Sequence, residues 1–143
     1  MKTQEVAIYR EIQRNAETAI KALDTLADKV YDKELAMQIS RQSLKYAGFR
    51  GEAVQALLDA KAEPYHANQL TDMVQRTGIH YNTLLNTSTG HIAELMIRER
   101  NQGTLELERV LKHNEDAGEK PRTLAKELLD YDQKSITTLK SYL

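Results

Sequence analysis

Hydrophobic residues recur every three or four positions along four stretches of the chain, which shorter and more polar segments separate. This spacing places apolar side chains on one face of an α-helix. It predicts four amphipathic helices, over about residues 3–30, 33–62, 89–115 and 121–142. The first helix shows the pattern over ten residues: Ile8, Tyr9, Ile12, Ala16, Ala19, Ile20, Leu23, Leu26, Ala27 and Val30.

The second predicted helix has clear end signals and a weak middle. Asp32 is suited to cap its start, because a carboxylate there can accept a hydrogen bond from a backbone N–H group of the first turn. Pro64 ends the helix, since a proline disfavours helical geometry in the residue before it. Gly48 and Gly51 weaken the interior and let a neighbouring segment approach closely.

The connections between the helices decide the topology. The last one is short, because Gly118 follows the third helix and Pro121 suits the first turn of the fourth. The connection over residues 65–89 is far longer than the roughly two to eight residues typical of bundles, and can travel the height of the molecule. We therefore predict one all-α domain over residues 1–143, a four-helix up-down bundle with a long, partly helical crossover and ferritin-like topology. The alternative is a five-helix bundle, in which residues 68–87 form a full helix.

Composition and charge bear on location and on partners. The 20 basic and 21 acidic side chains are interleaved and give a formal charge of −1, so we expect no nucleic-acid partner. The chain has no cysteine, and therefore no disulfide, thiol nucleophile or iron–sulfur cluster. The charged N-terminal segment does not resemble a signal peptide, and no apolar run approaches the roughly 20 residues that span a bilayer. We expect a cytoplasmic protein without a membrane partner.

Carboxylate and imidazole side chains on a bundle helix are the usual ligands of di-iron and di-manganese sites. Four candidates lie on the third predicted helix: His91, Glu94, Glu99 and Glu106. Such a site also needs a Glu-x-x-His pattern on each of two helices, and the chain has that pattern only at residues 63–66, where a proline interrupts the helix. We therefore expect no cofactor. The alternative is a degenerate iron or manganese site that uses some of these four residues.

Two charged residues interrupt apolar stripes and are candidates for a polar core. Arg50 lies within the stripe of the second helix, and Asp132 within that of the fourth. A buried charge needs a partner, so one hypothesis pairs the two with each other, or each with Tyr46, Tyr81 or a glutamate such as Glu99. In the alternative, Arg50 extends to the rim of the bundle and Asp132 lies in water at one end.

The segment NTSTGHIAELMIRERNQGTLELERVLKHN, from Asn86 to Asn114, resembles a segment of small uncharacterised helical-bundle proteins of Gram-positive bacteria. The shared feature is a Gly-His-Ile-Ala-Glu start, Gly90 to Glu94, on a long helix in chains of similar length. The resemblance implies a bacterial, cytosolic bundle and carries no catalytic residue.

These patterns favour a non-enzymatic protein that acts through self-association or protein interaction, as a homodimer or larger homo-oligomer. The catalytic patterns Gly-x-Ser-x-Gly and His-Glu-x-x-His and the phosphate-binding glycine loop are missing from the sequence. Two alternatives remain. One is a ferritin-like metal-binding protein or oxidoreductase, and the other is a bundle that binds a small anionic ligand in a pocket at Arg50.

Overall fold

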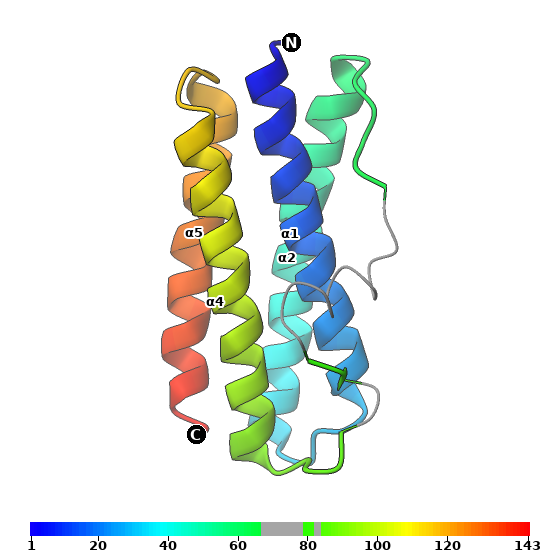
Figure 1. Ribbon diagram of the computed structural model, residues 1–143. Helices are drawn as coiled ribbons and strands as arrows, with labels where there is room; N and C mark the ends of the chain where they lie inside the picture. The colour runs from blue at the N-terminus through cyan, green and yellow to red at the C-terminus, as the bar shows by residue number, and fades with distance from the viewer. Residues whose placement is uncertain (67–78, 82–83) are drawn as a thin grey trace.

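Four long helices form a bundle in the structure of the protein, a computed structural model that describes residues 1–66, 79–81 and 84–143 (Figure 1). Their bounds are α1 (Thr3–Ala27), α2 (Lys33–Asp59), α4 (Thr89–His113) and α5 (Glu119–Lys140). The described residues contain no strand. The prediction of an all-α four-helix bundle is confirmed.

The helix directions follow from Figure 1, in which the N-terminus lies at the top of α1 and the C-terminus at the bottom of α5. α2 runs antiparallel to α1, and α5 runs antiparallel to α4. The end of α2 and the start of α4 lie at opposite ends of the bundle, so α2 and α4 are parallel. The fifth helix that residues 68–87 would form in the alternative prediction falls mainly on residues 67–78 and 82–83, which lie outside the described residues.

Local interactions at the helix ends explain where the helices begin. The Asp32 carboxylate accepts a hydrogen bond from the Leu35 backbone nitrogen at 2.8 Å, which confirms the predicted cap of α2. Ser88 caps α4 through a longer bond, 3.4 Å from the His91 nitrogen. Gly118 has a φ angle of +94°, a conformation that glycine adopts without steric cost, and it turns the chain into α5.

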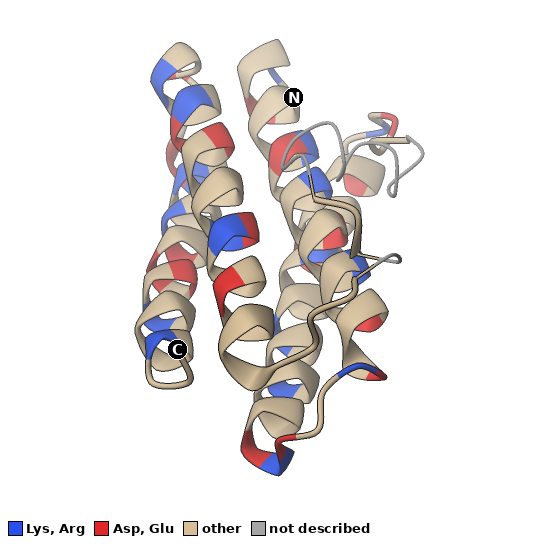
Figure 2. Cartoon of the chain, turned by 60° about the horizontal axis from the view of Figure 1, so that its bottom comes forward, with Lys and Arg blue, Asp and Glu red and all other residues tan. Residues whose placement is uncertain are grey.

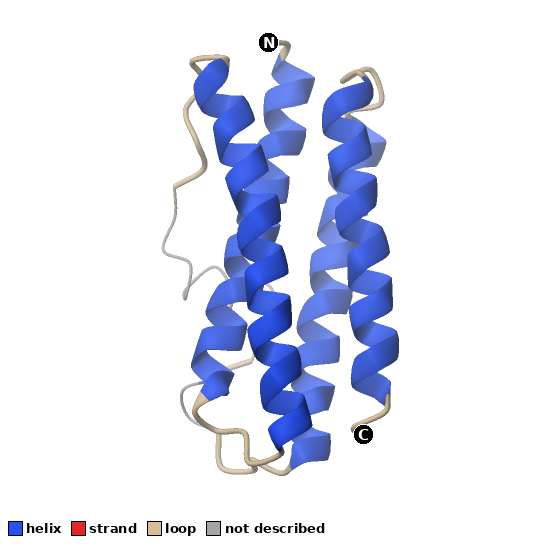
Figure 3. Ribbon diagram, turned by 180° about the vertical axis from the view of Figure 1, so that it is seen from behind, coloured by secondary structure: helices blue, strands red, loops and turns tan. Residues whose placement is uncertain are grey.

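The helices do not share the core equally. The middle of α1 is buried on all sides, over residues 11–13 and 15–19, and α1 packs against each of the other three helices. α2 and α5, by contrast, touch at few positions. Figure 3 shows these two helices as the pair on the back of the bundle. The α2–α5 edge is therefore the loosest side of the molecule.

Charged residues of both signs lie on every helix, as Figure 2 shows, and neither sign is confined to one face. Among the described residues, none of the helices combines the length and the apolar character that crossing a bilayer requires.

Candidate functional site

A buried polar cluster lies in the bundle core around Arg100 of α4. Arg100 is only 3% exposed. Its guanidinium donates hydrogen bonds to Asp132 Oδ1 at 3.0 Å and to Asn15 Oδ1 at 3.1 Å, and it forms an ion pair with Glu99. The same guanidinium lies 4.7 Å from the centre of the Tyr46 ring. We call these five residues the Arg100 cluster: Asn15, Tyr46, Glu99, Arg100 and Asp132.

The carboxylate of Asp132 is well satisfied. Besides Arg100, the Tyr46 hydroxyl donates to its Oδ1 atom at 2.7 Å, and the Thr104 hydroxyl donates to its Oδ2 atom at 3.3 Å. Asn15 comes from α1, Tyr46 from α2, Arg100 from α4 and Asp132 from α5. The cluster therefore ties all four helices together, and a shift of any one helix breaks a buried hydrogen bond.

Gly103 provides the space that the cluster needs between α1 and α4. The Asn15 side-chain amide donates to the Gly103 carbonyl oxygen at 2.7 Å. A Cβ atom at position 103 would lie 2.9 Å from Arg100 Nη2 and 2.9 Å from Asn15 Oδ1. Any larger residue would therefore displace the arginine or the asparagine.

The pKa values of Tyr46 and Arg100 are both raised in the cluster. Burial raises the pKa of Tyr46 well above its ordinary value, and the charges of Asp132 and Glu99 add to the rise, although Arg100 opposes it. Burial by itself lowers the pKa of Arg100, but Glu99, Tyr46 and Asp132 raise it by more than burial lowers it. The arginine is therefore charged and the tyrosine protonated across the neutral range.

The Arg100 cluster is closed to solutes. All five members are less than 5% exposed. The neighbouring cavity, between Gln42, Glu99 and Met96, measures about 10 Å³, which is room for about one water molecule. Gln42 lines this cavity, and its side-chain nitrogen has no hydrogen-bond partner among the described residues. A substrate cannot reach these groups, so they fix how the helices pack.

Arg50 lies outside this cluster. Its side chain is 46% exposed and donates to Glu17 Oε1 at 2.8 Å, so it does not pair with Asp132. The rim alternative thus describes Arg50, whereas Asp132 is buried and accepts a hydrogen bond from Tyr46.

The chain after α2 is attached to α1 close to Arg50. The Gln13 side chain accepts a hydrogen bond from the Tyr65 backbone nitrogen at 2.8 Å and donates one to the Tyr65 carbonyl oxygen at 3.0 Å. These contacts fasten the chain after α2 to α1, beside an open pocket of about 330 Å³ that Arg50 lines.

The four candidate metal ligands do not converge. His91 Nδ1 lies 3.6 Å from Glu94 at the exposed start of α4, and Glu94 also accepts from Arg98 at 2.8 Å. Glu99 is buried beside Arg100, and Glu106 accepts from the Gln102 side chain at 2.9 Å and from Arg109 at 3.2 Å. The part of the chain that the structure describes has no group of three or more His, Cys, Asp or Glu residues placed to hold a metal ion.

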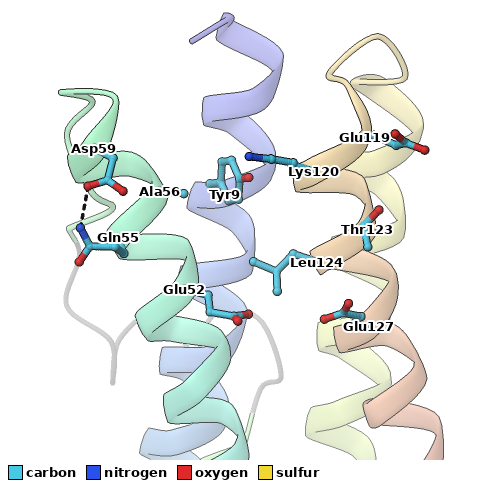
Figure 4. Close-up of a pocket in the computed structure, with 10 residues that line it drawn as sticks. All are labelled: Tyr9, Glu52, Gln55, Ala56, Asp59, Glu119, Lys120, Thr123, Leu124 and Glu127. Atoms are coloured by element: carbon cyan, nitrogen blue, oxygen red, sulfur yellow. Dashed lines mark hydrogen bonds between the residues drawn. The ribbon is translucent and has the colours of Figure 1, made fainter.

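An open groove follows the edge between α2 and α5. Its upper part encloses about 560 Å³, and Figure 4 shows Leu124 of α5 and Tyr9 of α1 lining it. Its lower part encloses about 340 Å³ beside Leu44 and Phe49. Both parts are lined by Glu52 of α2 and Glu127 of α5. We call the two parts together the α2–α5 groove.

The groove has an apolar floor and a mostly acidic rim. Its upper part is bordered by Glu52, Asp59, Glu119 and Glu127, against one lysine, Lys120. Burial raises the pKa of Tyr9, with a smaller contribution from the charge of Glu5.

Fold and site together define a helical bundle with a closed polar core and an open groove along the α2–α5 edge. Comparisons of the chain with protein-family models, with curated proteins and with solved structures find no match.

Sequence reasoning missed the centre of the cluster, although the pattern contained it. Arg100 comes four residues after Met96 and seven before Leu107, both on the apolar face of α4, and so falls on the same face. Asn15 likewise lies between Ile12 and Ala19 on the buried side of α1. A search for every polar residue on an apolar stripe would have found both.

Proposed function

We propose that this chain is a non-enzymatic helical-bundle protein that acts by binding another helical protein surface along the α2–α5 groove. The observation that carries the proposal is the contrast between the Arg100 cluster and the α2–α5 groove. The Arg100 cluster is sealed, whereas the groove is open, elongated and apolar at its floor. The cytoplasmic location, the bacterial origin and the ferritin-like topology expected from the sequence remain parts of the proposal.

The lining of the groove indicates the chemistry of the partner surface. Leu44 is 77% exposed beside the lower part, which leaves apolar area for a partner to cover. Glu52 and Glu127 face each other across the groove in Figure 4. A partner helix with an apolar face and basic flanking residues would complement both features.

Site-directed photocrosslinking in the producing cells tests the proposal. A photoreactive phenylalanine analogue replaces Thr123, which lines the groove, and in a control protein it replaces Glu108, on the exposed side of α4. We expect one defined adduct from position 123, mapped by mass spectrometry to a helical segment of one protein. Equal adduct yields from both positions, or no adduct from position 123, would contradict the proposal.

The two alternatives have less support. A metal site would need ligands that converge, and Glu94, Glu99 and Glu106 each contact an arginine instead. An anionic ligand at Arg50 would compete with Glu17 for the guanidinium. Elemental mass spectrometry of untagged protein, reloaded with iron, manganese or zinc and then dialysed, tests the metal alternative. Stoichiometric retained metal would favour it over the interaction proposal.

A further inference from the structure

The outward face of α2 is uncharged over most of the helix, in a chain with 29% charged residues. Eight exposed residues form this face, and we call them the α2 stripe: Met37, Ser40, Leu44, Ala47, Gly48, Gly51, Gln55 and Leu58. Three of them are large and apolar, with Met37 54%, Leu44 77% and Leu58 53% exposed. The stripe adjoins the α2–α5 groove, since Leu44 and Gly48 line its lower part.

No contact among the described residues requires the two glycines at the centre of the stripe, Gly48 and Gly51. A Cβ atom added to Gly48 or Gly51 would have no described atom within 4 Å, whereas one at Gly103 would collide with the Arg100 cluster. Glycine inside an exposed helix lowers helix stability relative to alanine. These positions are explained if the backbone of a partner helix approaches α2 closely at this point.

We propose that a second copy of this chain covers the α2 stripe, with the two α2 helices antiparallel about a two-fold axis between Ala47 and Gly48. The inference rests on the proposed function and names its partner. In such an isologous contact, a residue on one side of the axis meets the residue equally far on the other side in the second copy. The stripe forms four such pairs: Met37 with Leu58, Ser40 with Gln55, Leu44 with Gly51, and Ala47 with Gly48.

The four pairs are complementary in size and polarity. The large Leu44 side chain meets the open space at Gly51 of the second copy, and the reciprocal contact repeats this on the other side of the axis. Apolar Met37 meets apolar Leu58, and the smallest residues meet at the axis, where the helices come closest. A self-complementary pattern of this kind is what a two-fold contact requires.

Charges beside the stripe are also complementary under this symmetry. Arg41 and Lys45 lie on the half of α2 before the axis, and Glu52 lies on the half after it. Glu127 of α5 lines the same groove as Glu52. The two-fold axis brings Arg41 and Lys45 of one copy close to Glu52 and Glu127 of the other. The same contact forms a second time on the other side of the axis.

The area required by a stable dimer extends the contact onto α5. The stripe spans 22 residues, or about 33 Å of helix, and a helix about 10 Å wide gives a footprint of about 300 Å². A standard interface buries about 800 Å² per partner, so α2 alone is too small. The neighbouring side of α5 about doubles the footprint to about 600 Å² per partner, the lower end of the range for specific interfaces, and the α2–α5 groove therefore belongs to the interface.

Sedimentation velocity of the full chain, from about 1 to about 300 µM, tests the proposal directly. We expect a species of twice the 16.3 kDa chain mass that dissociates on dilution. Leu44→Glu should weaken the dimer at least about tenfold, because it places a charge against Gly51 of the second copy on each side of the axis. Leu105→Glu is the matched control, since Leu105 is 49% exposed on α4 and should leave the dimer unchanged. A wild-type chain that is monomeric throughout the range would overturn the inference.

A charge exchange tests the orientation. One variant carries Arg41→Glu with Lys45→Glu, and the other carries Glu52→Lys with Glu127→Lys. Each variant alone should be monomeric, because like charges then meet across the axis, and an equimolar mixture should restore a dimer. Dimers of equal strength in the separate variants, or no dimer in the mixture, would contradict the antiparallel arrangement.

A disulfide trap tests the position of the axis, because the chain has no cysteine of its own. Under mild oxidation, Ala47→Cys should give a covalent dimer at the short distance a disulfide needs, and Leu105→Cys should not. Equal crosslinking of the two variants would place the axis elsewhere.

The photocrosslinking experiment distinguishes failure of the dimer from failure of the proposed function. If the chain is monomeric but position 123 gives a defined adduct with a different protein, the dimer is wrong and the proposed function still holds.

Discussion

At the level of single residues, Arg100 is the side chain on which the buried contacts converge. Its guanidinium compensates Glu99 and Asp132 at a position where all three side chains are less than 5% exposed. Removal of one partner from a buried ion pair leaves a charge without compensation, which costs about 3–5 kcal/mol. We therefore expect Arg100→Met to lower the free energy of unfolding by about this amount, as measured by urea denaturation.

Arg98→Met, two residues earlier, is the control. Arg98 is 61% exposed and pairs with Glu94 on the helix surface, where such pairs contribute at most about 0.5 kcal/mol. The expected contrast between the two arginines depends on burial alone. A loss below about 1 kcal/mol for Arg100→Met would show that Glu99 and Asp132 do not depend on it.

The glycines give a second prediction at this scale, in which one substitution has opposite signs at two sites. Gly103→Ala forces a Cβ atom against Arg100 and Asn15, and we expect it to cost about 1–3 kcal/mol. Gly48→Ala meets no described atom and should stabilise the monomer by about 0.5–1 kcal/mol. Thermal unfolding at a concentration low enough for the monomer measures both. Stabilisation by Gly103→Ala would mean that the cluster tolerates displacement.

At the level of helices, the cap of α2 sets where that helix begins. Asp32→Ala removes the acceptor for the Leu35 backbone nitrogen, and we expect a loss of about 1 kcal/mol. Asp28→Ala is the control, because the Asp28 carboxylate is 83% exposed and should contribute less than about 0.5 kcal/mol. Urea denaturation of the two variants distinguishes them, and equal losses would show that the cap does not contribute.

The sequence located the helices well and their ends less well, for a physical reason. Val30 and Ala62 continue the apolar pattern, but α1 ends at Ala27 and α2 at Asp59. Both residues still pack against the core from the turns that follow. Hydrophobic periodicity indicates which side chains are buried, and burial can continue for several residues beyond the end of a helix.

The polar core was only partly predictable. Tyr46 and Asp132 fall on apolar stripes, and the structure joins them by a hydrogen bond. Arg50 falls on a stripe by the same criterion but lies at the rim with Glu17. Periodicity places a residue on a face to within about one position and contains no information on which residue of another helix lies opposite. Partners are decided by how the helices pack.

At the level of the whole molecule, the buried tyrosine makes global stability depend on pH in the alkaline range. Burial raises the pKa of Tyr46 in the folded chain well above 10.0, the value expected once the chain unfolds. Above pH 10 the unfolded chain therefore releases this proton while the folded chain retains it. The unfolded state then binds fewer protons, so stability is fully present below pH 10 and is lost as the pH rises above it.

We expect the free energy of unfolding to fall above pH 10 by up to about 1.4 kcal/mol per pH unit for each such tyrosine. Tyr46→Phe should make this decline shallower, although it also lowers stability at neutral pH through loss of the bond to Asp132. Tyr31→Phe, at a residue that is 86% exposed, is the matched control at the surface. Urea denaturation between about pH 8 and pH 11.5 measures the slopes, and tyrosinate absorbance reports when the ring ionises. If Tyr46→Phe and the wild type decline equally, Tyr46 ionises without unfolding, and the core around Arg100 is open to hydroxide.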